Sequence, residues 1–430
     1  MSTRNPSSSG LPTGDNVTRT VLPDGTVLLA HRNPATAGVT IQGMLGVGAA
    51  DVPTELSGLS RIHAEALTRG TRNRSARELA EAAESVGASF GFAGTTHALR
   101  FSAKCLSEDT PLLLDLMSDM LRNPVFPDDE VELVRGELLV EIEERDQDTR
   151  AVSEMAFRGA VYPEGHPYSR STEATEEKVN AITVADLASF HAAHATAHAL
   201  TLALVGDIDP ETVAEMVERT WFPASAGRTP IPDSLPPLSG TREKLLRHEV
   251  VPGKVQTDIT WGGHGPSRTH PDYMAASMAN LVLGGFAMMG RLGQSVREEQ
   301  GLAYYATSRL AISGGPGPWV CIAGVSPEDR EQAIASMETE VVRLINEPVS
   351  EEELEDCRSY LTGSLPLRLE SSEGIASAML DIEWNRLGPD YLLRYPDLVR
   401  SVMPDDIQRV TRYYLAPERA VCITAGPAVG

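Results

Sequence analysis

The sequence lacks long apolar runs, which limits where the protein can work. No stretch approaches the roughly 18 apolar residues of a membrane-spanning helix, although hydrophobic residues make up 41% of the 430-residue chain. Residues 1–16 are polar, rich in Ser, Pro and Gly, and contain no apolar core of a secretory signal. We therefore expect a cytoplasmic protein that does not associate with membranes, with residues 1–16 as a disordered tail.

Positive charge is scarce as well. The chain has 37 Lys and Arg against 60 Asp and Glu, which gives a formal net charge of −23. Nucleic acids and anionic membranes are polyanions, so this balance argues against both as partners. A basic peptide remains compatible with the charge.

Cysteine is sparse, and its spacing shows no pattern. The four cysteines are scattered along the chain and form no C-x-x-C pair. This gives no sign of a disulfide framework. We expect Cys105, Cys321, Cys357 and Cys422 to be reduced thiols in a reducing compartment.

The chain does contain a long internal repeat, which is the first feature to look for in a chain too long for one core. Four pairs of segments match in the same order: helix starts at Ser107 and Ser326, Pro-Val pairs at Pro124 and Pro348, helix segments at 182–187 and 402–407, and strands at 202–206 and 421–426. The members of each pair are separated by 219 to 224 residues. Four anchors in one order at nearly one offset indicate a duplication.

Each copy mixes the periods of strands and helices. In the first copy, strands are expected over residues 26–30, 39–46, 89–104 and 201–205, and a hairpin is expected around Gly94. Ser75 to Glu78 is a capping box that predicts a helix start. We therefore predict an α+β fold in which each copy is a mainly antiparallel sheet with helices packed on it.

The repeat also predicts the domain organisation. Two homologous domains are expected over residues 17–222 and 245–430. Residues 223–244 contain five prolines, a composition that predicts a linker. The two halves would together form one half of a clam shell that clasps something between its parts.

Residues 58–71 resemble the zinc-motif helix of the insulinase, pitrilysin and mitochondrial processing peptidase family, which reads G-L-x-H-F-x-E-H-M-x-F-x-G-T. The flanks Gly58-Leu59 and Gly70-Thr71 fit without a gap. Between them, Arg61 replaces the first His, Ala64 replaces the catalytic Glu, and Glu65 replaces the second His.

The resemblance gives these replacements a chemical meaning. In the family, two histidines on one helix face bind zinc, and the Glu is the general base acting on the zinc-bound water. Arginine has no lone pair to offer a metal, and alanine cannot accept a proton. The family's third ligand is a Glu about 76 residues after the second His, and Glu141 lies 76 residues after Glu65. The resemblance thus implies a chain that holds no zinc and is inactive alone.

These positions also suggest a local charge arrangement. Glu65 and Glu141 would repel each other with no metal between them, and Arg61 shares a helix face with Glu65. Our hypothesis is that the Arg61 guanidinium takes the zinc position and bridges both carboxylates. The alternative is a solvent-facing ion pair of little energetic weight.

A second family motif is retained. Residues 291–304 resemble the segment R-L-x-x-x-V-R-E-x-x-G-L-A-Y, and Arg297 and Tyr304 keep its seven-residue spacing. The resemblance implies that this pair reaches towards the zinc site and holds substrate main chain and the developing oxyanion. A guanidinium and a phenol are suitable donors for that role. The alternative is that Arg297 pairs with Glu298 or another neighbour while Tyr304 packs in the sheet.

Two other segments carry no functional prediction. Residues 284–290 lie where some non-catalytic processing-peptidase subunits have a glycine-rich substrate loop, but the segment is short, and we expect a flexible turn before a helix. His191, His194 and His198 have helical spacing without an acidic or Cys partner nearby, and the matching repeat segment has no His. We expect a solvated helix end there.

Three functions follow from the resemblance. The leading hypothesis is a non-catalytic subunit of a heterodimeric zinc metallopeptidase, in which a homologous partner holds the zinc and both chains enclose unfolded peptides. The second is a non-enzymatic peptide-binding or scaffold protein that associates with itself. The third is a self-sufficient peptidase with an altered metal site, which would require zinc bound by the isolated chain.

Overall fold

The computed structural model describes residues 11–169, 174–194, 200–221, 238, 243–286, 289–311 and 314–428. The chain divides into two compact units. The first consists of Met1–Ile142, Thr172–Asp233 and Leu365–Tyr395, and the second of Glu143–Ser171, Ser234–Ser364 and Pro396–Gly430. Most of the expected linker lies outside the described residues.

Part of the expected N-terminal tail has a defined structure. Residues 11–16 form a turn in which the Thr13 amide donates to the Asn16 side chain at 2.8 Å and the Asn16 amide group donates to the Leu11 carbonyl at 2.8 Å. Thr13 is buried. The prediction of a disordered tail is therefore wrong for residues 11–16, and residues 1–10 lie outside the described part.

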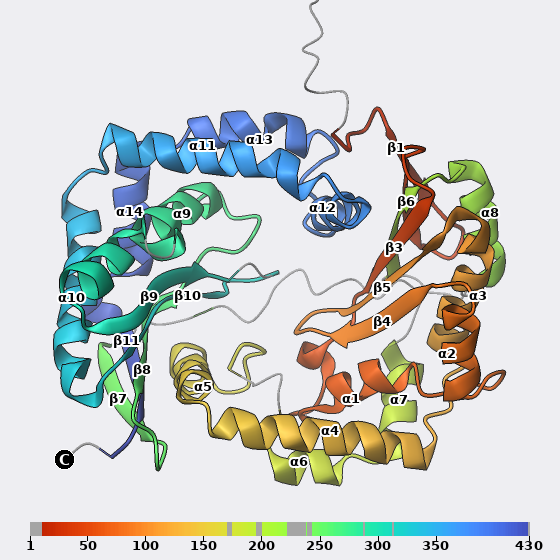
Figure 1. The fold of residues 1–430 in the computed structure, drawn as a ribbon, viewed down its shortest axis with the longest axis horizontal. Coiled ribbons are helices and arrows are strands. Elements are labelled where there is room, and N and C mark those ends of the chain that lie inside the picture. Colours follow the sequence, from red (N-terminus) through yellow and green to blue (C-terminus); the bar gives the residue numbers. More distant parts are fainter. Residues whose placement is uncertain are drawn as a thin grey trace, which may run out of the picture. The chain divides into compact units, whose positions relative to one another are not determined.

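The first unit is built on a six-stranded sheet of order β1-β2-β6-β3-β5-β4 (Figure 1). Its strands are β1 (Val17–Val21), β2 (Val27–Arg32), β3 (Gly38–Leu45), β4 (Ser89–Gly94), β5 (Leu99–Leu106) and β6 (Leu200–Gly206). Only β2 and β6 pair in parallel, and the other neighbours are antiparallel. The predicted strands and the hairpin at Gly94 are confirmed.

The second unit contains a five-stranded sheet of order β7-β11-β8-β10-β9. Its strands are β7 (Leu245–Val250), β8 (Thr257–His264), β9 (Ala303–Leu310), β10 (Pro318–Val325) and β11 (Val421–Gly426). The parallel pair β7–β11 stands where β2–β6 stands in the first sheet, and the rest is antiparallel. The shared strand order confirms the α+β class and agrees with a duplication.

The helices repeat in the same way. The first copy contains α1 (Leu59–Ala66), α2 (Ala76–Glu84), α3 (Thr110–Arg122), α4 (Asp128–Asp146), α5 (Thr149–Val161), α6 (Glu176–Ala181), α7 (Val184–His194) and α8 (Pro210–Thr220). The second contains α9 (Tyr273–Asn280), α10 (Arg330–Asn346), α11 (Glu351–Arg368), α12 (Ser372–Trp384), α13 (Tyr391–Arg400) and α14 (Pro404–Tyr414). The predicted helix starts near Ser107 and Ser326 correspond to α3 and α10.

Each half of the sequence covers one face of the other half's sheet with a helix. In the first unit, α12 packs on β3 and β6, and its Ile375 and Met379 share a core cluster with Met44 and Ala203. In the second unit, α5 packs on β8 and β11, with Phe157 against Ile423. The opposite face of the first sheet packs against a larger cluster that includes α1, α3 and α8. The unit boundaries therefore differ from a simple division at the linker.

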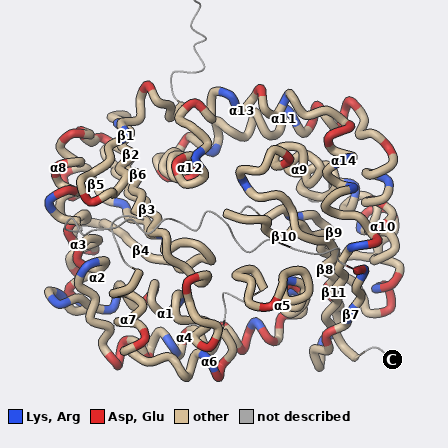
Figure 2. The backbone as a smooth tube through the Cα atoms, turned by 180° about the vertical axis from the view of Figure 1, so that it is seen from behind, with Lys and Arg blue, Asp and Glu red and all other residues tan. Residues whose placement is uncertain are grey.

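The distribution of acidic residues and the state of the four cysteines agree with what the composition led us to expect. Acidic residues are spread along many helices rather than gathered on one element (Figure 2). All four cysteines are free and buried. Among the described helices, none has the length and apolarity needed to cross a membrane.

Candidate functional site

The degenerate motif lies on α1, which begins at a glycine that the backbone requires. Gly58 has φ +106°, and a Cβ there would come within 2.7 Å of the Ala174 side chain. Ile62 and Ala64 are buried on the side of α1 that faces the core. Arg61 and Glu65 lie on the other side, each about one-third exposed.

Arg61 connects the two remaining acidic positions of the motif. Its Nε donates to Glu65 Oε1 at 3.0 Å, and its Nη2 donates to Glu141 Oε1 at 2.9 Å. Nη2 also lies 2.7 Å from Glu141 Oε2. Glu141 comes from α4, so one guanidinium joins two helices. The predicted bridge between both carboxylates is present in the structure.

These residues do not fit a zinc ion. Two carboxylates remain, and the group between them is a cation that cannot be deprotonated to act as a ligand. Ala64 is fully buried and offers no base. Across the described part of the chain, no cluster of three or more His, Cys, Asp or Glu side chains could hold a metal.

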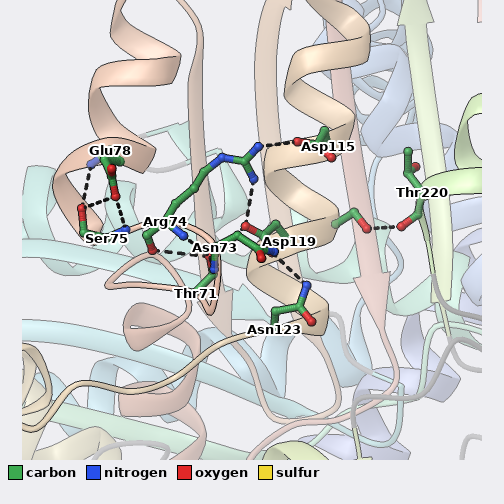
Figure 3. A network of polar contacts seen from close by, with 10 residues as sticks. Thr71, Asn73, Arg74, Ser75, Glu78, Asp115, Asp119, Asn123 and Thr220 are labelled. Carbon is green, nitrogen blue, oxygen red and sulfur yellow. Dashed lines mark hydrogen bonds and ion pairs between the residues drawn. The ribbon is translucent and has the colours of Figure 1, made fainter.

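The segment after α1 is fixed by a polar network that the sequence did not point to (Figure 3). The buried Asp119 carboxylate accepts hydrogen bonds from Thr71 Oγ1 at 2.8 Å, Asn73 Nδ2 at 2.6 Å and Arg74 Nη1 at 2.9 Å. Asn123 donates a fourth at 2.8 Å. Burial alone would raise the pKa of Asp119, but these donors lower it. The network fixes the Gly70-Thr71 end of the motif.

Arg297 and Tyr304 lie in the second unit, at the end of one element and the start of the next. Arg297 is in the last turn of a π-helical segment, Gly293–Glu299. Gly301, with φ +66°, ends it by donating its amide hydrogen to the Arg297 carbonyl at 3.0 Å. Tyr304 is the second residue of β9. The turn at Gly301 therefore connects the helical segment that carries Arg297 directly to the strand that carries Tyr304.

The two side chains are accessible. Within the described residues, the Arg297 side chain makes only a loose ion pair with Glu298, at 3.7 Å. Tyr304 is 84% exposed, so it does not pack in the sheet. No hydrogen bond of the Tyr304 hydroxyl is found within the described residues. The Arg297 guanidinium and the Tyr304 hydroxyl are therefore both accessible to a ligand that binds the second unit.

The segment that carries this pair is anchored by a residue that sequence reasoning passed over. Arg291 is buried and donates to Glu353 through Nε at 2.8 Å and Nη2 at 3.0 Å. Burial raises the pKa of Glu353, but hydrogen bonds from Arg291 and Ser350 lower it to about 2. The bidentate pair ties the π-helical segment to the start of α11. Arg291 stands in the family motif, which could have pointed to it.

The glycine-rich segment is packed rather than flexible where it is described. Gly284 and Gly285 end a π-helical segment, Leu281–Gly285, and the Gly284 carbonyl accepts from Thr307 Oγ1 at 2.7 Å. A Cβ on Gly284 would come within 2.5 Å of the Ser308 amide nitrogen. The expectation of a flexible turn is wrong for these two glycines. Ala287 and Met288 lie outside the described residues.

One histidine of α7, His191, is partly buried against a histidine of α1 instead of lying at a solvated helix end. His191 Nδ1 lies 3.0 Å from Nε2 of the fully buried His63 on α1. Burial lowers the pKa of His63 to about 3 and that of His191 to about 4, so both are neutral at pH 7. Phe126 and Phe190 pack around the pair. The expectation of a solvated end is wrong for His191, and His198 lies outside the described residues.

The fold and the motif positions define a peptidase-like chain, and comparison with known proteins gives its family. The chain belongs to the insulinase family, peptidase family M16. Residues 27–176 match the family model described as Insulinase (Peptidase family M16), and residues 181–361 match the one described as Peptidase M16 inactive domain.

Individual relatives agree with this assignment. An uncharacterized zinc protease of Streptomyces coelicolor is 27% identical over 92% of this chain and 86% of its own length. One of Mycobacterium leprae is 29% identical over 86% of this chain and 82% of its own length. A solved structure from Pseudomonas fluorescens, described as a peptidase M16 inactive domain, superimposes with a TM-score of 0.87 at 21% identity, covering 96% of this chain and 98% of its own.

Proposed function

We propose that this chain is the non-catalytic subunit of a heterodimeric zinc metallopeptidase. A homologous partner would hold the zinc, and this chain would contribute contacts to an unfolded peptide substrate in the cytoplasm. The single observation that carries the proposal is the Arg61 bridge. The Arg61 guanidinium, paired with Glu65 and Glu141, takes the place of a metal ion in the motif. Hydrolysis would therefore depend on a metal site in another chain.

Two features of this chain suit it to hold a peptide. Arg297 and Tyr304 present donors that have no strong competing partner in the described part of the chain, as needed to bind main-chain carbonyls and an oxyanion. The edge strand β4 pairs only with β5, which leaves one row of backbone groups for an added strand. The chain would therefore position substrate while its partner supplies the zinc-activated water.

The first experiment identifies the partner. The tagged chain is recovered from its native cells at low salt, and proteins that co-purify are identified by mass spectrometry. We expect a stoichiometric protein of similar size that carries an intact H-x-x-E-H motif. Recovery of the chain bound only to itself would contradict the proposal and favour a scaffold. About one equivalent of zinc in the isolated chain would favour a self-sufficient peptidase.

The second experiment tests the substrate contacts in the reconstituted complex. Arg297→Ala and Tyr304→Phe should each lower kcat/KM for peptide cleavage by about a hundredfold to a thousandfold, the range for loss of one oxyanion-hole donor. Arg400→Ala and Tyr413→Phe, at exposed positions of the same unit, are the matched controls and should have no effect. Unchanged cleavage in the Arg297 and Tyr304 variants would remove these residues from the proposal.

A further inference from the structure

One face of the first unit's sheet is only partly covered. Helix α12 packs on β3 and β6, which leaves β5 and β4 beyond it at the edge of the sheet (Figure 1). Along β5, Arg100, Ser102 and Lys104 are exposed, while Phe101 and Ala103 are buried on the opposite face. The exposed residues therefore share the face on which α12 packs.

A recess of about 400 Å³ lies on this part of the face. Its polar lining comes from three strand residues, Gln42, Arg100 and Ser102, and from Ser377 of α12. Ser377 Oγ donates to Gln42 Oε1 at 2.9 Å, which fixes one wall. On the side towards the sheet edge, the lining residues Gly91 and Ala93 are small, so the recess is open to whatever lies beside β4.

Arg100 is the unusual member of this lining. Its side chain makes no ion pair or hydrogen bond with any described residue. Its neighbour on the same face, Lys104, pairs with Glu373 at 2.5 Å. An unpaired guanidinium is notable in a chain with 60 acidic and 37 basic residues. Arg100 is exposed and lines a recess, so its five donors can bind an incoming carboxylate.

The register of β4 determines what a peptide would present to Arg100. Arg100 pairs with Ala93, and Ser102 pairs with Gly91. The Thr95 amide donates to the Ala98 carbonyl at 2.8 Å, so alternation along the hairpin directs the backbone groups of Phe90, Phe92 and Gly94 to the outer edge. In an added strand, the residues beside Ala93 or Gly91 would place side chains on the face of the recess.

We propose that this recess selects an acidic side chain in an extended peptide paired with β4, through the Arg100 guanidinium. The inference rests on the proposed function, because it names the substrate class of the same peptide-binding chain. The total of −23 favours basic peptides at long range, whereas the group in the recess is a cation with no acidic partner among the described residues.

The test measures binding of neutral-dye-labelled nonapeptides of alternating Thr and Val with a central Glu, Gln or Lys, by fluorescence anisotropy with the full chain. We expect the Glu peptide to bind about fivefold more tightly than the Gln peptide, as for one partly exposed ion pair. The preference should disappear in Arg100→Ala and reverse towards Lys in Arg100→Glu. It should also shrink in 0.5 M salt, because exposed charges are screened.

Two controls separate the possible outcomes. Arg77→Glu changes the net charge equally at an exposed position on α2 and should keep the preference. A Glu peptide with N-methylated backbone cannot complete strand pairing and should bind weakly. Equal binding of Glu, Gln and Lys peptides would overturn the acidic site and leave the proposed function standing. No binding of any peptide would count against both.

Discussion

At the scale of single residues, the contacts of Arg61 identify positions from which metal ligands should converge. Arg61 and Glu65 are four residues apart on α1, and Glu141 approaches from α4. The double substitution Arg61→His and Glu65→His would place two imidazoles on one helix face beside a carboxylate. We expect this variant to bind about one equivalent of zinc, measured by elemental analysis after dialysis.

The control for this prediction is the same variant with Glu141→Gln, which should bind zinc much more weakly. Peptidase activity is not expected, because Ala64 still provides no base. Zinc content no higher than in the unmodified chain would show that the ligands do not converge as the Arg61 contacts indicate.

The pair of histidines His63 and His191 should make the free energy of unfolding depend on pH. His63 and His191 have folded pKa values of about 3 and about 4, below the ordinary value near 6.5. Between pH 6.5 and 4 the unfolded chain therefore binds protons that the folded chain does not. Stability should be insensitive to these groups above pH 7 and fall as the pH drops, by up to about 1.4 kcal/mol per pH unit for each histidine.

The measurement is urea unfolding at pH 7, 6 and 5. The double variant His63→Phe and His191→Leu should lose less stability than the unmodified chain over this interval, whereas His270→Gln, at a half-exposed position, should not differ from it. Parallel curves for the double variant and the unmodified chain would contradict the assignment of the pH dependence to this pair.

At the scale of elements, the anchoring of the Arg297 segment can be tested through Arg291. Arg291→Met leaves the Glu353 carboxylate without its bidentate partner, and we expect a loss of about 2 kcal/mol at pH 7, less than for a fully buried pair because Glu353 is partly exposed. The folded pKa of about 2 means that the contribution of Glu353 is lost as the pH falls from about 4 towards 2.

Urea unfolding at pH 7 gives the magnitude. The double variant Arg291→Met and Glu353→Gln should recover part of the loss, because it removes the unpaired charge. An unfolding free energy within 0.5 kcal/mol of the unmodified chain for Arg291→Met, the ordinary range of surface substitutions, would show that the pair does not anchor the segment.

Element type and order could be predicted from sequence because they depend on local periodicity and on the repeat. The strands near Leu28, Ile41 and Leu204, and the hairpin at Gly94, agree with the structure. Contacts between segments distant in the sequence could not be predicted. The burial of His191 depends on His63, 128 residues earlier, and the Asp119 network depends on Thr71, 48 residues earlier. Neither pairing leaves a local signal.

The candidate site also contains some features that could be predicted from the sequence and others that could not. The Arg61 bridge could be predicted because family spacing brings Glu141 to α1, and opposite charges at one position attract. The roles of Arg297 and Tyr304 in substrate binding remain predictions. Arg100 has no distinguishing mark in sequence, because its significance comes from the recess around it and from the absence of an acidic neighbour among the described residues.

At the scale of the whole molecule, the boundaries of the sequence repeat differ from the boundaries of the two compact units. The sequence repeats at one offset, but the boundaries between the units at residues 142 and 364 fall within α4 and α11. Helix α12 covers β3 and β6, and α5 covers β8 and β11. The apolar side chains Ile375 and Met379 share a core cluster with Met44 and Ala203 of the first half, and Phe157 shares one with Ile423 of the second half.

This exchange of helices constrains how such a chain can change over time. A gene coding for one half alone would produce a sheet with an uncovered apolar face, a surface prone to aggregation. Fission of the gene would therefore be tolerated only if both fragments were made together and reassembled. After the duplication, the exchange of helices therefore made each half of the sequence depend on the other for a complete core.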